Sequence, residues 1–210
     1  MTPAGVLRAH LGLCPLVAIV RGVTPDEAEA TGRAIFAAGI RIIEVPLNSP
    51  DPLVSIRLLS AALGGEALVG AGTVLEPGQV ADVKAAGGRI TVSPDCNPAV
   101  IGAAAAAGLI SCPGYLTPSE AFSALRAGAH GLKLFPAEAA SPAALKAQLA
   151  VIPSDVPIIV VGGVKRDHMQ PWLDAGAAGF GLGGGLYSAG QSADETHARA
   201  RAFVTALAPR

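Results

Sequence analysis

The sequence predicts an α/β protein, a (β/α)₈ barrel with an extra N-terminal helix. Three observations predict this fold: eight short aliphatic runs recur about every 20 to 27 residues, alanine-rich segments of helical length separate them, and glycine-rich turns follow the last two runs. Alternating strands and helices form either a closed barrel or an open, doubly wound sheet. An open dinucleotide-binding sheet has its glycine loop after the first strand, whereas barrels place anion sites after strands seven and eight. We therefore predict one barrel domain over residues 1–210.

The predicted strands are rich in branched aliphatic residues and are bounded by glycine, proline or charged residues, which is typical of buried parallel strands. An N-terminal helix is expected over residues 1–13 and a closing helix over residues 191–207. The strands are expected at residues 16–20, 41–45, 67–71, 89–93, 109–112, 131–135, 157–161 and 178–182.

Proline marks the expected start of several helices. In the first helical turn the missing N–H costs nothing, and a preceding Ser or Thr can cap the helix. Ala-Gly pairs mark expected helix ends, because glycine readily adopts the left-handed conformation that stops a helix. The starts are Thr24-Pro25, Ser49-Pro50, Glu76-Pro77, Thr117-Pro118 and Ser141-Pro142, and the ends are Ala38-Gly39, Ala127-Gly128 and Ala175-Gly176.

Composition narrows the class of protein. A formal net charge of −1 and 15% charged residues leave no basic surface for nucleic acid or for a membrane. The charge-free stretch 96–119 contains three prolines, so a transmembrane helix is not expected there. The three cysteines, Cys14, Cys96 and Cys112, have no metal-type spacing, and neither do the four histidines. We expect free thiols, a cytoplasmic protein and no metal site.

Three charged residues lie at the ends of predicted strands, where barrels carry their chemistry. Arg21 follows the first strand, Glu44 lies between Ile43 and Val45 in the second, and Lys133 lies in the apolar sixth. Period-two alternation points Glu44 into the barrel if its neighbours pack against the helices. Burial lowers the pKa of an amine and yields a neutral nucleophile, and an adjacent carboxylate can transfer protons. A buried structural ion pair is the alternative.

Two glycine-rich turns follow the last two predicted strands. Gly162-Gly163 and Gly183-Gly184-Gly185 leave backbone amides uncovered, so phosphate oxygens can approach them. Each turn alone is a weak signal, because glycine also serves steric needs. Together, on neighbouring late strands, they predict a phosphate site.

The motifs, taken in chain order, resemble those of the class I 2-keto-3-deoxy-6-phosphate aldolases, and the resemblance covers essentially the whole chain. The resemblance implies a homotrimeric (β/α)₈ enzyme in which Lys133 forms a Schiff base, Glu44 moves protons, and Arg21 and Thr73 hold the pyruvyl part of the substrate. No cofactor is implied. The motifs are Arg21-Gly22-Val23-Thr24-Pro25, Glu44-Val45-Pro46-Leu47-Asn48-Ser49-Pro50, Gly70-Ala71-Gly72-Thr73-Val74, Ser93-Pro94, Cys112-Pro113-Gly114, Leu132-Lys133-Leu134-Phe135-Pro136 and Gly162-Gly163-Val164.

Further residues are expected to bind substrate. The segment 47–50, the segment 186–191 and Val161 resemble the galactonate branch of the family, whose substrate is 2-dehydro-3-deoxy-6-phosphogalactonate. Ala137-Glu138 resembles the gluconate-type enzymes instead, and Gly184 stands where the family often has a serine. The other expected substrate-binding residues are Pro94, Phe135, Gly162, Gly163, Gly183 and Gly184.

The expected reaction is cleavage of this phosphorylated keto acid to pyruvate and D-glyceraldehyde 3-phosphate, with no nucleic-acid or membrane partner. Alternative substrates are the gluconate epimer and unphosphorylated 4-hydroxy-2-oxoglutarate. A phosphate-binding barrel isomerase would use Glu44 as its base and Lys133 only electrostatically. A non-catalytic phosphosugar-binding barrel is the remaining alternative.

Overall fold

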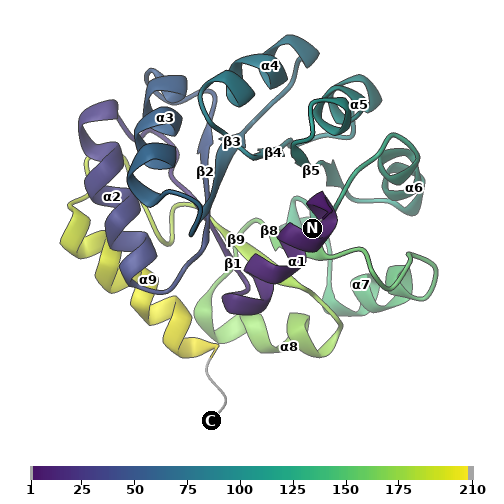
Figure 1. The fold of residues 1–210 in the computed structure, drawn as a ribbon. Helices are drawn as coiled ribbons and strands as arrows, with labels where there is room; N and C mark the ends of the chain where they lie inside the picture. Colours follow the sequence, from purple (N-terminus) through teal and green to yellow (C-terminus); the bar gives the residue numbers. More distant parts are fainter. Residues whose placement is uncertain (1, 208–210) are drawn as a thin grey trace.

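The aliphatic runs form the strands of a parallel barrel surrounded by helices (Figure 1). The computed structural model describes residues 2–207. The strands are β1 (Leu16–Ile19), β2 (Ile42–Pro46), β3 (Leu68–Gly72), β4 (Ile90–Val92), β5 (Ile110–Cys112), β6 (Gly114–Tyr115), β7 (Leu132–Leu134), β8 (Ile158–Val161) and β9 (Gly179–Leu182).

The sheet closes through a strand that is interrupted. Its order is β5-β4-β3-β2-β1-β9-β8-β7-β6, and every pairing is parallel. Only Pro113 separates β5 from β6, so these two short strands at opposite ends of the order together make one barrel strand. Proline has no N–H to give to a ladder. The single strand predicted over 109–112 is therefore extended beyond the proline, and the predicted barrel is confirmed.

Helices follow the strands in alternation, and a further helix precedes them. They are α1 (Pro3–Leu13), α2 (Pro25–Ala37), α3 (Pro52–Leu63), α4 (Pro77–Ala85), α5 (Pro98–Ala106), α6 (Pro118–Arg126), α7 (Pro142–Leu149), α8 (Met169–Asp174) and α9 (Ala193–Ala206), with 3₁₀ turns at Ala137–Ala139 and Arg166–His168.

α1 is the extra N-terminal helix and covers the amino-terminal end of the barrel (Figure 1). Its Leu7 and Leu11 are buried among the inward-facing residues of the strands. A Cβ on Gly131, just before β7, would meet Leu7 at 2.7 Å, which places this helix against the starts of the strands. The helix therefore forms a floor under the barrel interior. Met1 of the predicted segment 1–13 lies outside the described residues.

Most predicted helix boundaries are confirmed, with one error. Gly39, Gly128 and Gly176 have φ between 101° and 113° directly after their helices, as left-handed stops require. The predicted start at Ser49-Pro50 is wrong, because α3 begins at Pro52. Ser49 is instead buried, and its hydroxyl accepts a hydrogen bond from the Gly22 N–H at 3.0 Å.

Two hydrophobic layers follow from the alternation of side chains along the strands. Ile42 belongs to the layer inside the barrel. Ile43 and Val45 belong to the layer between the barrel and its helices. Glu44, between them, therefore points into the barrel, as predicted.

Two further expectations can be compared with the structure over residues 2–207. The three cysteines are free. No helix in this part of the chain has the length and apolarity needed to cross a membrane.

Candidate active site

A cavity of about 340 Å³ opens at the carboxyl ends of the strands and brings the predicted site residues together. Its lining joins residues from early strands to residues from late ones. The predicted residues that line it are Arg21, Glu44, Thr73, Pro94, Lys133, Phe135, Val161, Gly162, Gly163, Gly183 and Gly184.

Glu44 reaches the cavity from β2 and is almost fully buried, at 2% exposure. Gly72 of β3 makes room for it, because a Cβ there would overlap the Glu44 carboxylate. The Oε2 atom has no hydrogen-bond partner among the described residues. Burial raises the pKa of Glu44 to about 7, although the positive charges of Lys133 and Arg21 oppose the shift. Glu44 can therefore both accept and release a proton near neutral pH.

Lys133 reaches the same cavity from β7 and is 8% exposed. β7 is held between β6 and β8, and the Lys133 N–H donates to the Pro113 carbonyl at 2.9 Å. Its Nζ lies 4.5 Å from the centre of the Phe135 ring. Burial lowers the pKa of Lys133, the carboxylate of Glu44 opposes that shift, and Arg21 adds to it. The environment thus favours a neutral amine.

Glu44 and Lys133 face one cavity without forming an ion pair. Within residues 2–207, the pairs closer than 4.0 Å are Arg33–Glu29, His168–Asp167 and Arg199–Glu195. A structural ion pair needs direct contact to offset the cost of burying two charges. Both groups therefore remain available to a ligand in the cavity.

Arg21 and Thr73 lie at the rim of the cavity. The Arg21 guanidinium donates a hydrogen bond to Asn48 Oδ1, so the loop after β2 holds the arginine in place. Thr73 follows β3 with φ of 55°, a left-handed conformation that threonine rarely adopts. Such strain gathers at functional sites, where surrounding structure enforces it. Both features fit residues that are held in position for a ligand.

The two glycine turns lie side by side at the cavity but have different surroundings. Gly162 and Gly163 have φ of 117° and 56°, and the Glu138 side chain packs against both of them. In the other turn, the Gly183 carbonyl accepts hydrogen bonds from the N–H groups of residues 186 and 187. No acceptor within residues 2–207 takes the N–H groups of Gly184 and Gly185. These two amides are therefore free to bind an anion.

The sequence matches the pattern of the "KDPG and KHG aldolase" family over residues 7–201. It is 48% identical to 2-dehydro-3-deoxy-6-phosphogalactonate aldolase of Escherichia coli K12 over 91% of this chain and 94% of that protein. The chain belongs to the KDPG and KHG aldolase family.

Solved structures of this family superpose closely on the chain. One, described as a native KDPGal structure, has a TM-score of 0.89 at 48% identity and covers 91% of this chain and 93% of its own. A KDPG aldolase from Legionella pneumophila, with pyruvate captured as a covalent carbinolamine, has a TM-score of 0.80 at 28% identity, covering 98% and 96%. The protein is accordingly an aldolase, a carbon–carbon lyase.

The aldolase cavity also contains residues that the sequence interpretation did not include. They are Ile19, Gly181 and Leu182. Val164 and Gly185 also line the cavity and belong to motifs already named in the sequence, Gly162-Gly163-Val164 and the glycine triplet 183–185. Ile19 and Gly181 carried no usable signal, since inward-facing aliphatic residues and glycines also occur throughout a barrel core.

Proposed function

We propose that the protein is a Schiff-base aldolase that cleaves 2-dehydro-3-deoxy-6-phosphogalactonate to pyruvate and D-glyceraldehyde 3-phosphate. The observation that carries this proposal is the pair formed by Lys133 and Glu44, both buried in one cavity and not in contact with each other. The E. coli relative that bears this name supports the choice of substrate.

The reaction begins with the neutral amine of Lys133, which attacks the C2 ketone; the adduct takes up one proton and loses water to form an iminium, and this proton is released again when the iminium is hydrolysed. Glu44 takes the proton of the C4 hydroxyl as the C3–C4 bond breaks. The bonding electrons move into the iminium and leave an enamine, while C4 becomes the aldehyde of the departing fragment. Glu44 then returns its proton to C3, and water hydrolyses the imine to release pyruvate and regenerate Lys133.

Arg21 and Thr73 have the chemistry to hold the pyruvyl end. A guanidinium offers two parallel donors to a carboxylate, and the Asn48 contact fixes its direction. The glycine turns after β8 and β9, next to β1 in the barrel, suit the 6-phosphate.

We expect Gly183→Ala to raise the KM for the phosphorylated substrate by about three- to tenfold, because the added methyl group crowds the anion site. Gly183 has no positive φ and no protein atom within 4 Å of an added Cβ, so the change should not strain the fold. The measurement is steady-state kinetics with the phosphorylated substrate and with an unphosphorylated analogue.

Gly12→Ala is the matched control, since Gly12 also has open space around it and lies on α1 at the other end of the barrel. Gly12→Ala should leave the kinetic constants for both substrates unchanged. If Gly183→Ala damages both substrates equally, the turn is structural and 4-hydroxy-2-oxoglutarate becomes the better candidate substrate.

The preference for the galactonate epimer is tested by cleavage of the two epimeric 6-phosphates side by side. Val161 lines the cavity with hydrocarbon and is 7% exposed. Threonine would fill nearly the same space and add a hydroxyl able to bond the C4 oxygen. We expect Val161→Thr to shift the ratio of kcat/KM toward the gluconate epimer by about two- to tenfold. A wild-type enzyme that cleaves the gluconate epimer at least as well would contradict the substrate assignment.

The homotrimer stays a prediction from the family resemblance. Light scattering of the purified protein measures the mass directly, and a monomeric mass would contradict it.

A further inference from the structure

We propose that Arg199 supplies the positive charge with which the aldolase recognises the phosphate group of its substrate. This inference rests on the function proposed above. It assigns the phosphate mainly to the Gly183–Gly185 turn, and it adds a side chain from the closing helix to the site.

The charges around the glycine turns favour such a residue. The Glu138 side chain packs against the Gly162–Gly163 turn, and a Cβ on Gly163 would lie 2.9 Å from Glu138 Oε1. This exposed carboxylate makes the potential at that turn less favourable for a phosphate dianion than the potential at the Gly183–Gly185 turn. Backbone amides carry only partial charges, so a full positive charge on the other side would strengthen anion binding.

Arg199 is placed on that other side. From α9 its Nη1 approaches the Gly184 carbonyl oxygen at 3.5 Å. That carbonyl belongs to the same planar peptide as the free Gly185 N–H. The positive charge beside this carbonyl polarises the peptide and makes its N–H a better donor. Arg199 therefore favours anion binding at Gly185 even before it contacts the anion itself.

The Arg199 guanidinium also has more N–H donors than its contacts with Gly184 and Glu195 use. Its Nη2 donates to Glu195 Oε1 at 2.6 Å, one turn earlier on α9. The arginine side chain is 39% exposed, so this ion pair is weak and can be exchanged for a phosphate. A guanidinium has five N–H donors in a planar fork that matches phosphate oxygens.

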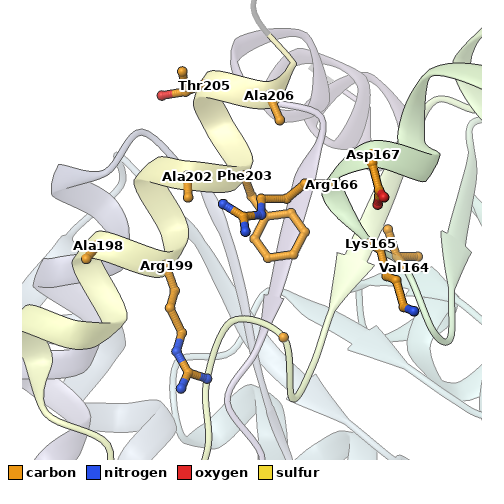
Figure 2. A pocket seen from close by; sticks show the side chains of 11 residues that line it. Val164, Lys165, Arg166, Asp167, Ala198, Arg199, Ala202, Phe203, Thr205 and Ala206 are labelled. Atoms are coloured by element: carbon orange, nitrogen blue, oxygen red, sulfur yellow. The ribbon is translucent and has the colours of Figure 1, made fainter.

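The surrounding groove gives the phosphate a positively charged approach. The groove has a volume of about 1280 Å³ and shares Val164 and Gly185 with the smaller cavity. Lys165 and Arg166 line its other wall together with Asp167. Figure 2 shows Arg199 extending from α9 toward the loop that precedes this helix, whereas Arg166 lies across the groove beside the Phe203 ring. Arg199 is thus the cation of the groove that contacts the glycine turn.

The test compares Arg199→Gln with wild type on the 6-phosphate substrate and on its 6-hydroxyl analogue. We expect a KM for the phosphorylated substrate about tenfold higher, with kcat little changed and the analogue unaffected. Arg199→Lys keeps the charge and should recover part of the affinity. The effect should shrink in high salt, because the charge is partly exposed.

Arg33→Gln is the matched control. Arg33 forms the same type of pair with Glu29, four residues earlier on α2, and it lines neither the cavity nor the groove. Arg33→Gln should leave KM and kcat for both substrates unchanged. An Arg199→Gln enzyme with a wild-type KM, or with equal losses on both substrates, overturns the proposal.

Calorimetric titration with inorganic phosphate separates this inference from the proposed function. If wild type binds phosphate and Arg199→Gln binds it about tenfold more weakly, Arg199 is an anion-binding residue even if the sugar phosphate proves a poor substrate. If both bind phosphate equally, the inference fails while the Schiff-base chemistry stands.

Discussion

Lys133→Ala is expected to abolish cleavage, with a loss on the order of 10⁴-fold or more, because no other group in the cavity can form the iminium. Borohydride reduction in the presence of pyruvate should attach one pyruvate-derived mass to the peptide that contains Lys133. Mass spectrometry of the digested protein locates that mass. The isomerase alternative, in which Lys133 acts only through its charge, predicts no trapped adduct.

Lys146→Ala is the matched control for this experiment. Lys146 is an exposed lysine on α7. Its removal should change neither turnover nor labelling. Labelling that persists in Lys133→Ala would place the imine on another lysine and would remove the central residue of the proposed mechanism.

Glu44→Gln is expected to lower turnover by about 10²- to 10⁴-fold while imine formation survives. The amide keeps the shape of the side chain but cannot accept the C4 hydroxyl proton. Rapid-mixing kinetics would therefore show cleavage slowed, whereas borohydride with pyruvate would still label Lys133. Near-normal turnover would reduce Glu44 to a structural residue.

The pH profile gives an independent measure of Glu44. Its pKa is raised to about 7, mainly by burial. A carboxyl group acts as a base only above its pKa, so kcat/KM of the wild type should fall as the pH drops through about 7. The lowered pKa of Lys133 acts in the same direction, because a higher pH also increases the neutral amine. Glu29→Gln, a change in an exposed carboxylate of α2, should leave the profile unaltered.

The fold and the main site residues could be predicted because they depend on local patterns. The alternation Ile43-Glu44-Val45 fixes which side chain enters the barrel, and a proline in the first turn fixes most helix starts. The start of α3 is predicted wrongly because Ser49 does not cap this helix. Its hydroxyl accepts from Gly22, a contact between residues far apart in the sequence.

Other features depend on distances that no sequence pattern contains. The separation of Glu44 from Lys133 follows from the shape of the closed barrel. The packing of Glu138 on Gly162 and Gly163, and the approach of Arg199 to Gly184, join segments whose relation appears only after folding. For the same reason the two glycine turns looked equivalent in the sequence but lie beside opposite charges in the structure.

The helix α1 has a consequence for the order of events during turnover. Leu7 and Leu11 of this helix cover the amino-terminal end of the barrel, so the cavity is a passage that opens only at the carboxyl ends of the strands. Lys133 lies deep in this passage, and the glycine turns lie toward its mouth. The aldehyde fragment therefore has to leave before the bound three-carbon unit can follow. In the reverse, bond-forming direction, pyruvate enters first and the aldehyde second. The aldehyde is therefore the last substrate to bind in synthesis and the first product to leave in cleavage.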